Sequence, residues 1–268
     1  DRTVRLHFIT GSEPDMHEPG SDMRRIHEAL EPQWDLKDLI TDFSIMRTMQ
    51  PILRKGKWQV TAAVRDGQEL IALWPGLKEQ VFGLAVDLGS TTIAAHLCDL
   101  ATGEVMASSG LMNPQIRFGE DVMSRVSYSM MNPGGDVEMT ATVREALNDL
   151  AKATTEEAGV DVTDILDITL VSNPIMHHLL LGMDPLELGG APFALATDFG
   201  TRLKARELDL TFHPGALAYV LPCIAGHAAS VLGPGPRRAR RRGGRAVRGP
   251  LGQRGRRWAL ACGMALVA

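Results

Sequence analysis

Apolar residues are grouped along the chain in short runs separated by polar turns, which is the pattern of buried β-strands. The runs at 84–86 and 93–97 are apolar enough to be covered on both faces, and the polar stretch 88–92 between them predicts a hairpin. Another turn at 101–104 precedes an apolar run at 105–108. This part of the sequence therefore predicts a meander of three antiparallel strands.

The segments after this meander have apolar residues at helical spacing. Residues 137–158 predict a long amphipathic helix, and a shorter helix before it presents Val122, Val126 and Met130 on one face. A strand is expected next, at 165–171. Strands that alternate with helices in this way indicate an α/β arrangement.

Two further segments place polar groups at the end of a strand. At 174–182 a helix is expected, with Asn173 as its N-cap and Pro174 in its first turn. The run at 218–225 predicts a strand that leads into Gly226. A strand that feeds a helix N-terminus is a position where anions and polar ligands gather.

The beginning of the chain predicts a smaller α/β unit. Its expected elements are three strands and two helices, at 4–9, 21–30, 48–53, 58–64 and 69–73. The last two are strands that flank an Asp-Gly pair, a strong hairpin signal. Pro75 and Gly76 then interrupt the pattern. We place a domain boundary there.

The sequence thus predicts an α/β (α+β) fold in three parts. Residues 1–79 form the small α/β domain, and residues 80–231 form a lobe with a mixed sheet. Residues 232–268 form a basic tail rich in arginine and glycine.

Charge is distributed unevenly along the chain. The net charge of −4 hides two regimes, because ten arginines fall between Arg237 and Arg257 while no Asp or Glu follows Asp209. The hypothesis we favour for the tail is a shifted reading frame or a truncated gene in GC-rich DNA. The alternative is a basic arm that binds nucleic acid, although Trp258 is the one aromatic residue there that could stack on bases.

The rest of the composition is that of a globular protein. Hydrophobic residues make up 44% of the chain, and no apolar run approaches the roughly 20 residues of a membrane-spanning helix. The N-terminus shows neither the basic nor the apolar segment of a secretion signal. We expect a cytoplasmic protein with no membrane segment.

The hairpin between the first two strands of the meander carries the chemistry. Asp87 stands at the strand end, where a carboxylate could hold a hydrated Mg²⁺. Gly89 permits positive φ and a close approach of the backbone, while Ser90, Thr91 and Thr92 offer N–H and hydroxyl donors to phosphate oxygens. The alternative is an ordinary hairpin with a polar turn. We interpret the turn as a nucleotide-binding loop.

A second polar cluster follows the meander and consists of Gln115, Arg117, Glu120, Asp121 and Arg125. Polar side chains are unusually dense here for the end of a loop. They fit either a cleft or a solvated surface with i,i+4 pairs such as Asp121 with Arg125. The residues alone leave both interpretations open.

Histidines and cysteines do not form a metal-site pattern. His177 and His178 are adjacent, so on a helix they point about 100° apart and cannot chelate one metal in the usual manner. Packing or capping of the helix is the interpretation that these residues favour. Cys98, Cys223 and Cys262 are far apart, with no C-x-x-C pair.

Four segments give the chain a family resemblance. They are Gly-Leu-Ala-Val-Asp-Leu-Gly-Ser-Thr-Thr at 83–92, Asn-Pro-Gln at 113–115 with Phe-Gly-Glu-Asp-Val at 118–122 and Ser-Arg at 124–125, Ser-Asn at 172–173 with Met-His-His at 176–178, and Cys-Ile-Ala-Gly-His at 223–227. Together they resemble the activase domain of the reductive activators of corrinoid proteins, an actin-like (ribonuclease H-like) ATPase family. The segment before Gly83 is similar to the middle domain of this family. The resemblance implies a fragment whose actin-like lobe is incomplete.

The resemblance also implies roles for residues. Asp87 would be the catalytic and Mg²⁺-positioning carboxylate. The ATP-binding residues would be Gly89, Ser90, Thr91, Thr92, Asn173 and Gly226. The residues near the cleft or the partner surface would be Gln115, Arg117, Glu120, Asp121, Arg125, His177 and His178.

By the same resemblance, the function would be ATP-dependent restoration of Co(I) from Co(II) in a corrinoid protein of a methyltransferase system. The full-length family also carries a [2Fe-2S] cluster, for which this chain has no ligands. The sequence does not decide whether the protein forms a homodimer. The alternatives are a small-molecule kinase of the actin and hexokinase-like superfamily and a non-functional fragment.

Overall fold

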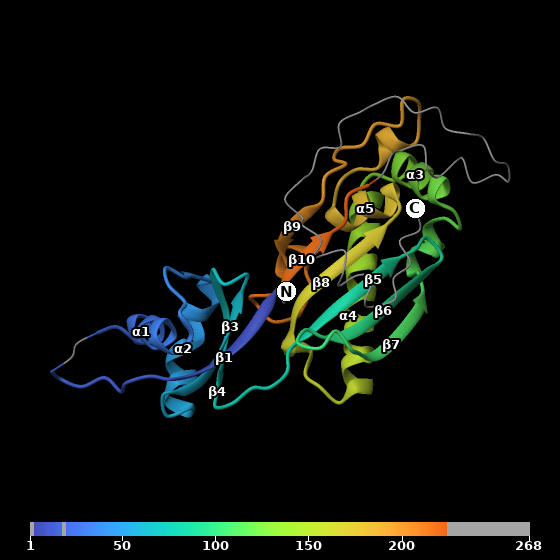
Figure 1. Cartoon of the computed structure of the whole chain (residues 1–268). Helices are drawn as coiled ribbons and strands as arrows, with labels where there is room; N and C mark the ends of the chain where they lie inside the picture. Colours follow the sequence, from blue (N-terminus) through green and yellow to red (C-terminus); the bar gives the residue numbers. More distant parts are fainter. Residues whose placement is uncertain (1–2, 18–19, 224–268) are drawn as a thin grey trace, which may run out of the picture.

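The computed structural model of the protein describes residues 3–17 and 20–223, which contain two β-sheets that lie side by side (Figure 1). Each sheet packs helices against one of its faces. Both sheets are mixed, because each contains parallel and antiparallel pairs of strands. The predicted α/β (α+β) class with a mixed sheet is therefore confirmed.

The N-terminal sheet has the strand order β1-β3-β4-β2. Its strands are β1 (Val4–Thr10), β2 (Ile40–Thr41), β3 (Gln59–Arg65) and β4 (Glu69–Pro75). Helices α1 (Asp22–Trp34) and α2 (Phe43–Lys55) pack on one face. Ile26 of α1 and Ile45 of α2 meet Val60 of β3 in the core between helices and sheet.

The second sheet has the strand order β7-β6-β5-β8-β10-β9. Its strands are β5 (Phe82–Leu88), β6 (Thr92–Asp99), β7 (Val105–Met112), β8 (Ile165–Ser172), β9 (Thr201–Lys204) and β10 (Leu217–Val220). The meander β5-β6-β7 is antiparallel, as predicted. Strands β8 and β10 continue the sheet in parallel with β5.

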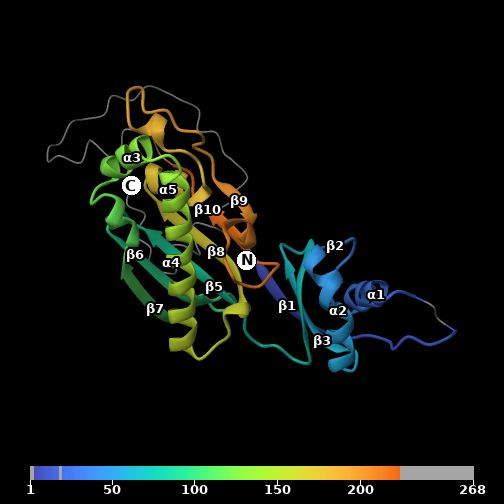
Figure 2. The ribbon, with the colours of Figure 1, turned by 180° about the vertical axis from the view of Figure 1, so that it is seen from behind.

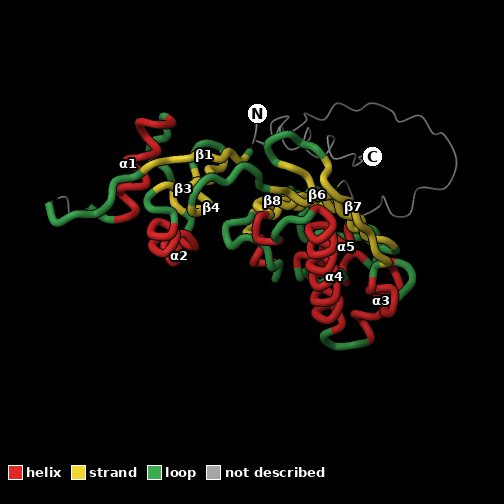
Figure 3. Tube along the Cα trace, turned by 90° about the horizontal axis from the view of Figure 1, so that it is seen from below, coloured by secondary structure: helices red, strands yellow, loops and turns green. Residues whose placement is uncertain are grey.

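Helices cover one face of this second sheet, as Figures 2 and 3 show. They are α3 (Val122–Met131), α4 (Gly135–Ala158) and α5 (Pro174–Leu181). Short 3-10 turns join the elements: η1 (Pro114–Phe118), η2 (Val162–Asp164), η3 (Leu186–Leu188) and η4 (Ala205–Leu208). Alternate residues of β5, among them Leu84, Val86 and Leu88, pack under α4 in the core. Because side chains alternate along a strand, Asp87 points to the other face.

The parallel register brings two predicted segments to one edge of the sheet. Leu88, the last residue of β5, is the partner of Ser172, the last residue of β8. The turn after β5 and the start of α5 at Asn173 therefore leave the sheet at the same edge. Ligands of open α/β sheets bind at the carboxyl ends of parallel strands.

The expected elements are found, and several are longer than expected. Helix α2 spans Phe43–Lys55 rather than 48–53, because Asp42 caps it through the backbone N–H of Ser44 at 2.8 Å. Helix α1 continues to Trp34, where the indole N–H donates to the Phe8 carbonyl of β1 at 3.0 Å. The strand expected at 218–225 is β10 (Leu217–Val220). It ends earlier than expected, because residues 221–223 are not in a strand, and residues 224–225 lie outside the described part of the chain.

The three residues expected on one face of α3 differ in their burial. Val126 is buried, but Met130 is 69% exposed. An α-helix has 3.6 residues per turn, so each i,i+4 step rotates the side chain by about 40° around the helix axis. Two such steps from Val122 place Met130 toward solvent. The inner side is occupied instead by Arg125, which is fully buried, and by Val126.

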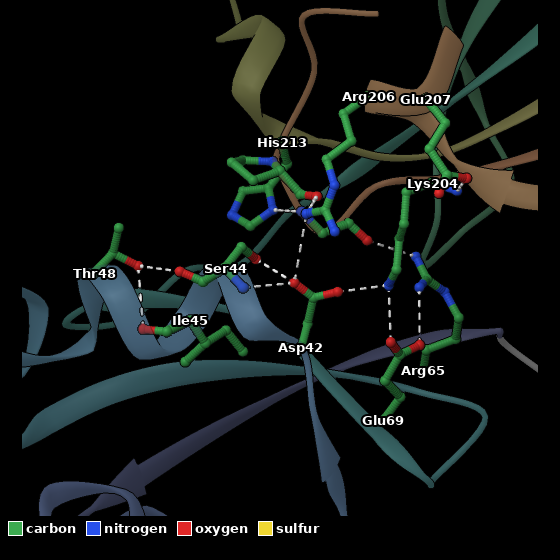
Figure 4. Close-up of polar contacts among 12 residues, drawn as sticks. Asp42, Ser44, Ile45, Thr48, Arg65, Glu69, Lys204, Arg206, Glu207 and His213 are labelled. Atoms are coloured by element: carbon green, nitrogen blue, oxygen red, sulfur yellow. Dashed lines mark hydrogen bonds and ion pairs between the residues drawn. The ribbon is translucent and has the colours of Figure 1, made fainter. Parts of the chain in front are cut away.

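Charged residues join the two sheets on the side where β9 meets β4 (Figure 4). The Lys204 ammonium lies 2.7 Å from an Asp42 oxygen and 2.8 Å from a Glu69 oxygen. Arg65 pairs with Glu69 at 3.2 Å and donates to the Leu166 carbonyl of β8 at 3.0 Å. The N-terminal unit is thus tied to the second sheet by buried or half-buried ion pairs.

Candidate functional site

The turn between β5 and β6 is held from behind by the segment that follows β7. The side-chain amide of Asn113 donates to the Gly89 carbonyl at 2.8 Å, and its backbone N–H donates to the Thr91 carbonyl at 2.8 Å. The Arg125 guanidinium donates to the Ser90 carbonyl between them. Three consecutive carbonyl groups of the turn therefore accept hydrogen bonds from the protein.

This arrangement leaves the donors of the turn available. In a trans peptide the N–H of one residue points away from the carbonyl of the preceding residue, so the N–H groups of Ser90 and Thr91 face away from their support. Within the described residues, neither these N–H groups nor the hydroxyls of Ser90, Thr91 and Thr92 donate a hydrogen bond. Thr91 and Thr92 are exposed. The donor set fits phosphate oxygens.

Gly89 is required for a reason that was not expected. Its φ does not lie in the left-handed region, so the expected positive φ is not found. A Cβ added at Gly89 would lie 2.5 Å from the carbonyl oxygen of Thr92, which is too close for any side chain. The glycine is needed because the two sides of the turn approach each other there.

The Asp87 carboxylate lies beside this turn. It is exposed, and within the described residues it forms no hydrogen bond or ion pair. An exposed carboxylate next to phosphate donors fits a hydrated Mg²⁺, which is commonly bound through one or two carboxylates and substrate phosphates.

Arg125 connects three of the four motifs. Its guanidinium donates to Ser90 in the turn, to the Gln115 side chain at 3.2 Å and to the Met176 sulfur at 3.0 Å. Its Nε also donates to the Gly119 carbonyl at 3.1 Å. Burial lowers the pKa of Arg125, and the negative charge of Asp121 opposes that effect. Even so, an arginine stays charged in a protein.

The polar cluster after β7 is divided between the interior and the surface. Gln115 is buried and donates to the Met139 carbonyl of α4 at 2.8 Å. Arg117, Glu120 and Asp121 are exposed. Asp121 caps α3 by accepting from the Ser124 N–H at 2.8 Å, and hydrogen bonds from Ser124 lower the pKa of Asp121.

The i,i+4 ion pair of the solvated-surface interpretation is absent from the described residues. Asp121 and Arg125 make no ion pair, because the guanidinium turns inward to the Ser90 carbonyl. The cluster is therefore neither wholly a surface nor wholly a cleft.

The segment after β8 is a structural cap with two buried histidines. Asn173 caps α5 by accepting from the Met176 N–H at 3.0 Å. The Ala196 N–H donates to His178 Nε2 at 3.0 Å, so the ring proton is on Nδ1, which donates to the Pro174 carbonyl at 2.8 Å. His178 is thus a neutral anchor for the loop that contains Ala196.

His177 is also buried, but neither of its ring nitrogens has a hydrogen-bond partner in the described part of the chain. Burial, with a smaller contribution from His178, lowers the pKa of His177 to about 4. Neither histidine reaches the surface or the turn. Their expected role near a partner or cleft remains a prediction, and Gly226 lies outside the described residues.

A cavity of about 550 Å³ lies elsewhere in the described structure. Its lining includes Phe82, the first residue of β5, together with Lys78, Gly159 and Asp164. The turn follows Leu88 at the other end of β5, so this cavity is not part of the candidate site. The site at the turn is an open edge of the sheet.

The described residues contain no group of three or more His, Cys, Asp or Glu side chains placed to hold a metal ion. A [2Fe-2S] cluster of the ferredoxin kind is held by four cysteine thiolates, and the whole sequence has three cysteines. The chain therefore does not fit that cofactor. No helix in the described part is long and apolar enough to cross a bilayer.

Asn113 is the residue that sequence reasoning missed. The Asn-Pro pair at 113–114 signals a cap, and Asn113 does cap η1 by accepting from the Gln115 N–H at 2.9 Å. Its bond to Gly89 spans 24 positions in the chain. No local pattern could have indicated it.

Comparison with known proteins defines the class to which this fold and site belong. Residues 1–80 match the family model "RACo linker region", and residues 82–230 match "RACo middle region". The chain therefore belongs to the RACo family, and the expected resemblance to reductive activators of corrinoid proteins is confirmed. The names of the two regions differ from the expected middle and activase domains. The expected division into domains stays a prediction.

Two relatives support this assignment. A solved structure titled "Reductive activator for corrinoid, iron-sulfur protein" is 30% identical, covers 84% of this chain and has a TM-score of 0.70. The corrinoid activation enzyme RamQ of Eubacterium limosum is 25% identical over 187 residues, or 69% of this chain. The chain spans only about a third of the length of either protein, 36% and 32% respectively.

Proposed function

We propose that this chain binds the phosphates of Mg-ATP at the turn after β5, as part of an ATP-dependent reductive activator of a corrinoid protein. The observation that carries the proposal is the support of the turn from behind. Asn113 and Arg125 hold the Gly89, Ser90 and Thr91 carbonyls, so the donors of the turn face outward. Such a preorganised set of N–H and hydroxyl donors favours an anion.

Each exposed group has a role in this proposal. The N–H and hydroxyl groups of Ser90, Thr91 and Thr92 bind phosphate oxygens. Asp87 holds Mg²⁺ through its water shell, and the metal ion offsets the charge between phosphates. Asn173 lies at the same edge of the sheet and lines the nucleotide site, because β5 and β8 end in register.

The corrinoid protein enters the proposal through the relatives. A structural relative is titled a reductive activator for a corrinoid, iron-sulfur protein, and a curated relative is a corrinoid activation enzyme. In this proposal the full-length activator returns inactive Co(II) to Co(I), and the one electron comes from the [2Fe-2S] cluster of the full-length family, for which this chain has no ligands. ATP that binds one arrangement of the activator more tightly shifts its population, and with it the affinity for the partner. The role of this chain is nucleotide binding and partner recognition.

Calorimetric titration of Mg-ATP into the wild-type chain and the Asp87→Ala variant tests the proposal. We expect the variant to bind Mg-ATP at least tenfold more weakly, while the two proteins bind ATP equally in EDTA, where no metal ion is present. Glu104→Ala is the matched control, because Glu104 is an exposed carboxylate in the next hairpin of the same sheet. Equal affinity and hydrolysis in wild type and Asp87→Ala would remove Asp87 from the mechanism. Failure of the wild type to bind Mg-ATP, or phosphoryl transfer to a sugar, would refute the function.

A further inference from the structure

The outer face of α3 carries no charge. Arg125 is the single charged residue of this helix, and it is fully buried on the inner side. The solvent side presents exposed Ser127 and three methionines, Met123, Met130 and Met131, which are 43%, 69% and 74% exposed. We call these three methionines the methionine face. A surface helix normally places charged residues on its outer side, so this uncharged face departs from the usual pattern.

Charged side chains border the methionine face and are mostly acidic. Glu120 and Asp121 are exposed just before α3, and Asp136 and Glu138 lie in the first turn of α4 just after it. Arg117 is the basic residue among them and lies 4.0 Å from Glu138. An apolar centre with a charged rim is the anatomy of a protein–protein interface. By charge complementarity, the partner should present an apolar patch bordered by basic residues.

The size of the face indicates a transient contact. Three partly exposed methionines offer roughly a few hundred Å² of apolar surface, the scale of a functional patch on a monomer. A stable interface buries about 800 Å² on each partner, so this patch alone is too small for a permanent dimer. Methionine side chains are flexible and polarizable, and they suit surfaces that bind and release a partner.

The same helix also supports the candidate nucleotide site. On its inner side Arg125 donates to the Ser90 carbonyl of the turn and to the Met176 sulfur of α5. Helix α3 therefore contacts the turn on its inner side and carries the methionine face on its outer side. The buried guanidinium of Arg125 would transmit a change in the position of the turn to this helix.

We propose that the methionine face is the docking surface for the corrinoid protein, centred on Met130 and Met131 and bordered by the acidic rim. The identity of the partner rests on the proposed function. A target that must be bound and then released fits an uncharged, adaptable patch better than a permanent interface would. The proposal therefore requires an apolar patch with a basic border on the corrinoid protein.

Binding of purified corrinoid iron-sulfur protein in the Co(II) state to the full chain, measured by biolayer interferometry, tests this proposal. We expect Met130→Glu with Met131→Glu to weaken binding at least tenfold, and raised salt to weaken wild-type binding. Met16→Glu is the matched control, since Met16 is 97% exposed in the segment before α1, and it should change the affinity less than twofold. Equal affinity of the double variant and the wild type overturns the proposal.

Two further measurements identify other occupants. Sedimentation that shows a wild-type dimer and a monomeric double variant would make the face an interface between copies of this chain and overturn the proposal. A large loss of thermal stability in the double variant would show that the chain itself covers the face, which overturns it as well. Mg-ATP affinity, measured separately, reports on the nucleotide site. If the wild type binds the partner but not Mg-ATP, the proposed nucleotide function is refuted and the proposed docking surface stands.

Discussion

Replacement of Asp42 by asparagine tests how the two sheets are held together. Asp42 is 6% exposed and lies between the cap of α2 and the Lys204 ammonium of β9. Burial by itself would raise the pKa of Asp42, but hydrogen bonds from Lys204 and Ser44 outweigh it and lower the pKa from 3.8 to about 2. The folded protein therefore favours the ionised carboxylate. Asparagine keeps the shape and one acceptor but removes the charge.

The size of the effect follows from linkage. A group whose pKa is depressed in the folded state stabilises the protein above its unfolded pKa, and the contribution is lost as the pH falls through the folded pKa. At about 1.4 kcal/mol per pKa unit, the shift of Asp42 corresponds to about 2 kcal/mol near pH 6, about 1 kcal/mol at pH 3, and little at pH 1. Lys204 keeps Glu69 but loses the other of its two carboxylate partners, which adds to the loss in the variant.

The assay is urea unfolding of the wild type and Asp42→Asn at pH 6 and at pH 3. We expect the difference in the free energy of unfolding to be about 2 kcal/mol at pH 6 and about half of that at pH 3. His213 lies near this cluster. Burial lowers its pKa to about 4, and the charge of Asp42 opposes that effect, so the loss of Asp42 adds, through His213, a contribution at pH 3 that is opposite in sign to the decrease expected from Asp42 itself.

The control is Asp35→Asn, because Asp35 is 92% exposed beside Lys37 at 3.5 Å and should contribute less than about 0.5 kcal/mol. A difference for Asp42→Asn below that of the control at pH 6, or one that does not shrink at pH 3, would refute the reasoning.

Two further predictions concern buried contacts. Arg125→Met should lower the free energy of unfolding by about 1–3 kcal/mol and weaken Mg-ATP binding, because it leaves the Ser90 carbonyl without its donor; a variant with unchanged urea unfolding and calorimetry would contradict this. Gly215→Ala should destabilise the chain by about 1–3 kcal/mol in urea unfolding, because the new Cβ would lie 2.1 Å from the Ile71 carbonyl oxygen. Gly190→Ala, where nothing lies within 4 Å, is its control and should not destabilise the chain.

Most of the fold could be predicted because its signals are local. The hairpin of β5 and β6 is visible as two apolar runs around a polar turn, and the long helix α4 as a periodic pattern that ends at Gly159. The length of α1 could not be predicted, since its last turn is held by a bond from Trp34 to β1. The contact of Asp42 with Lys204 joins residues on different sheets and left no trace in the sequence pattern.

The candidate site was predictable in its residue types and less so in its geometry. A carboxylate, a glycine and three hydroxyls in one turn indicated phosphate chemistry, and the structure leaves Asp87, Thr91 and Thr92 exposed. The burial of the second polar cluster could not be predicted, because nothing in the sequence distinguishes exposed Arg117 from buried Arg125. Burial of Arg125 depends on acceptors from three separate segments.

The convergence on Arg125 changes how the motifs of this chain are understood. Seen in sequence, the polar residues of 113–125 and 172–178 look like further ligands for a nucleotide or a partner. In the structure Gln115 and Met176 contact the guanidinium that holds the Ser90 carbonyl, so they act on the site through its support. The groups that would meet phosphate include the backbone N–H groups of Ser90 and Thr91, which no substitution except proline removes. It follows that variants in these motifs should change nucleotide affinity through the shape of the turn, and that stability and affinity should fall together.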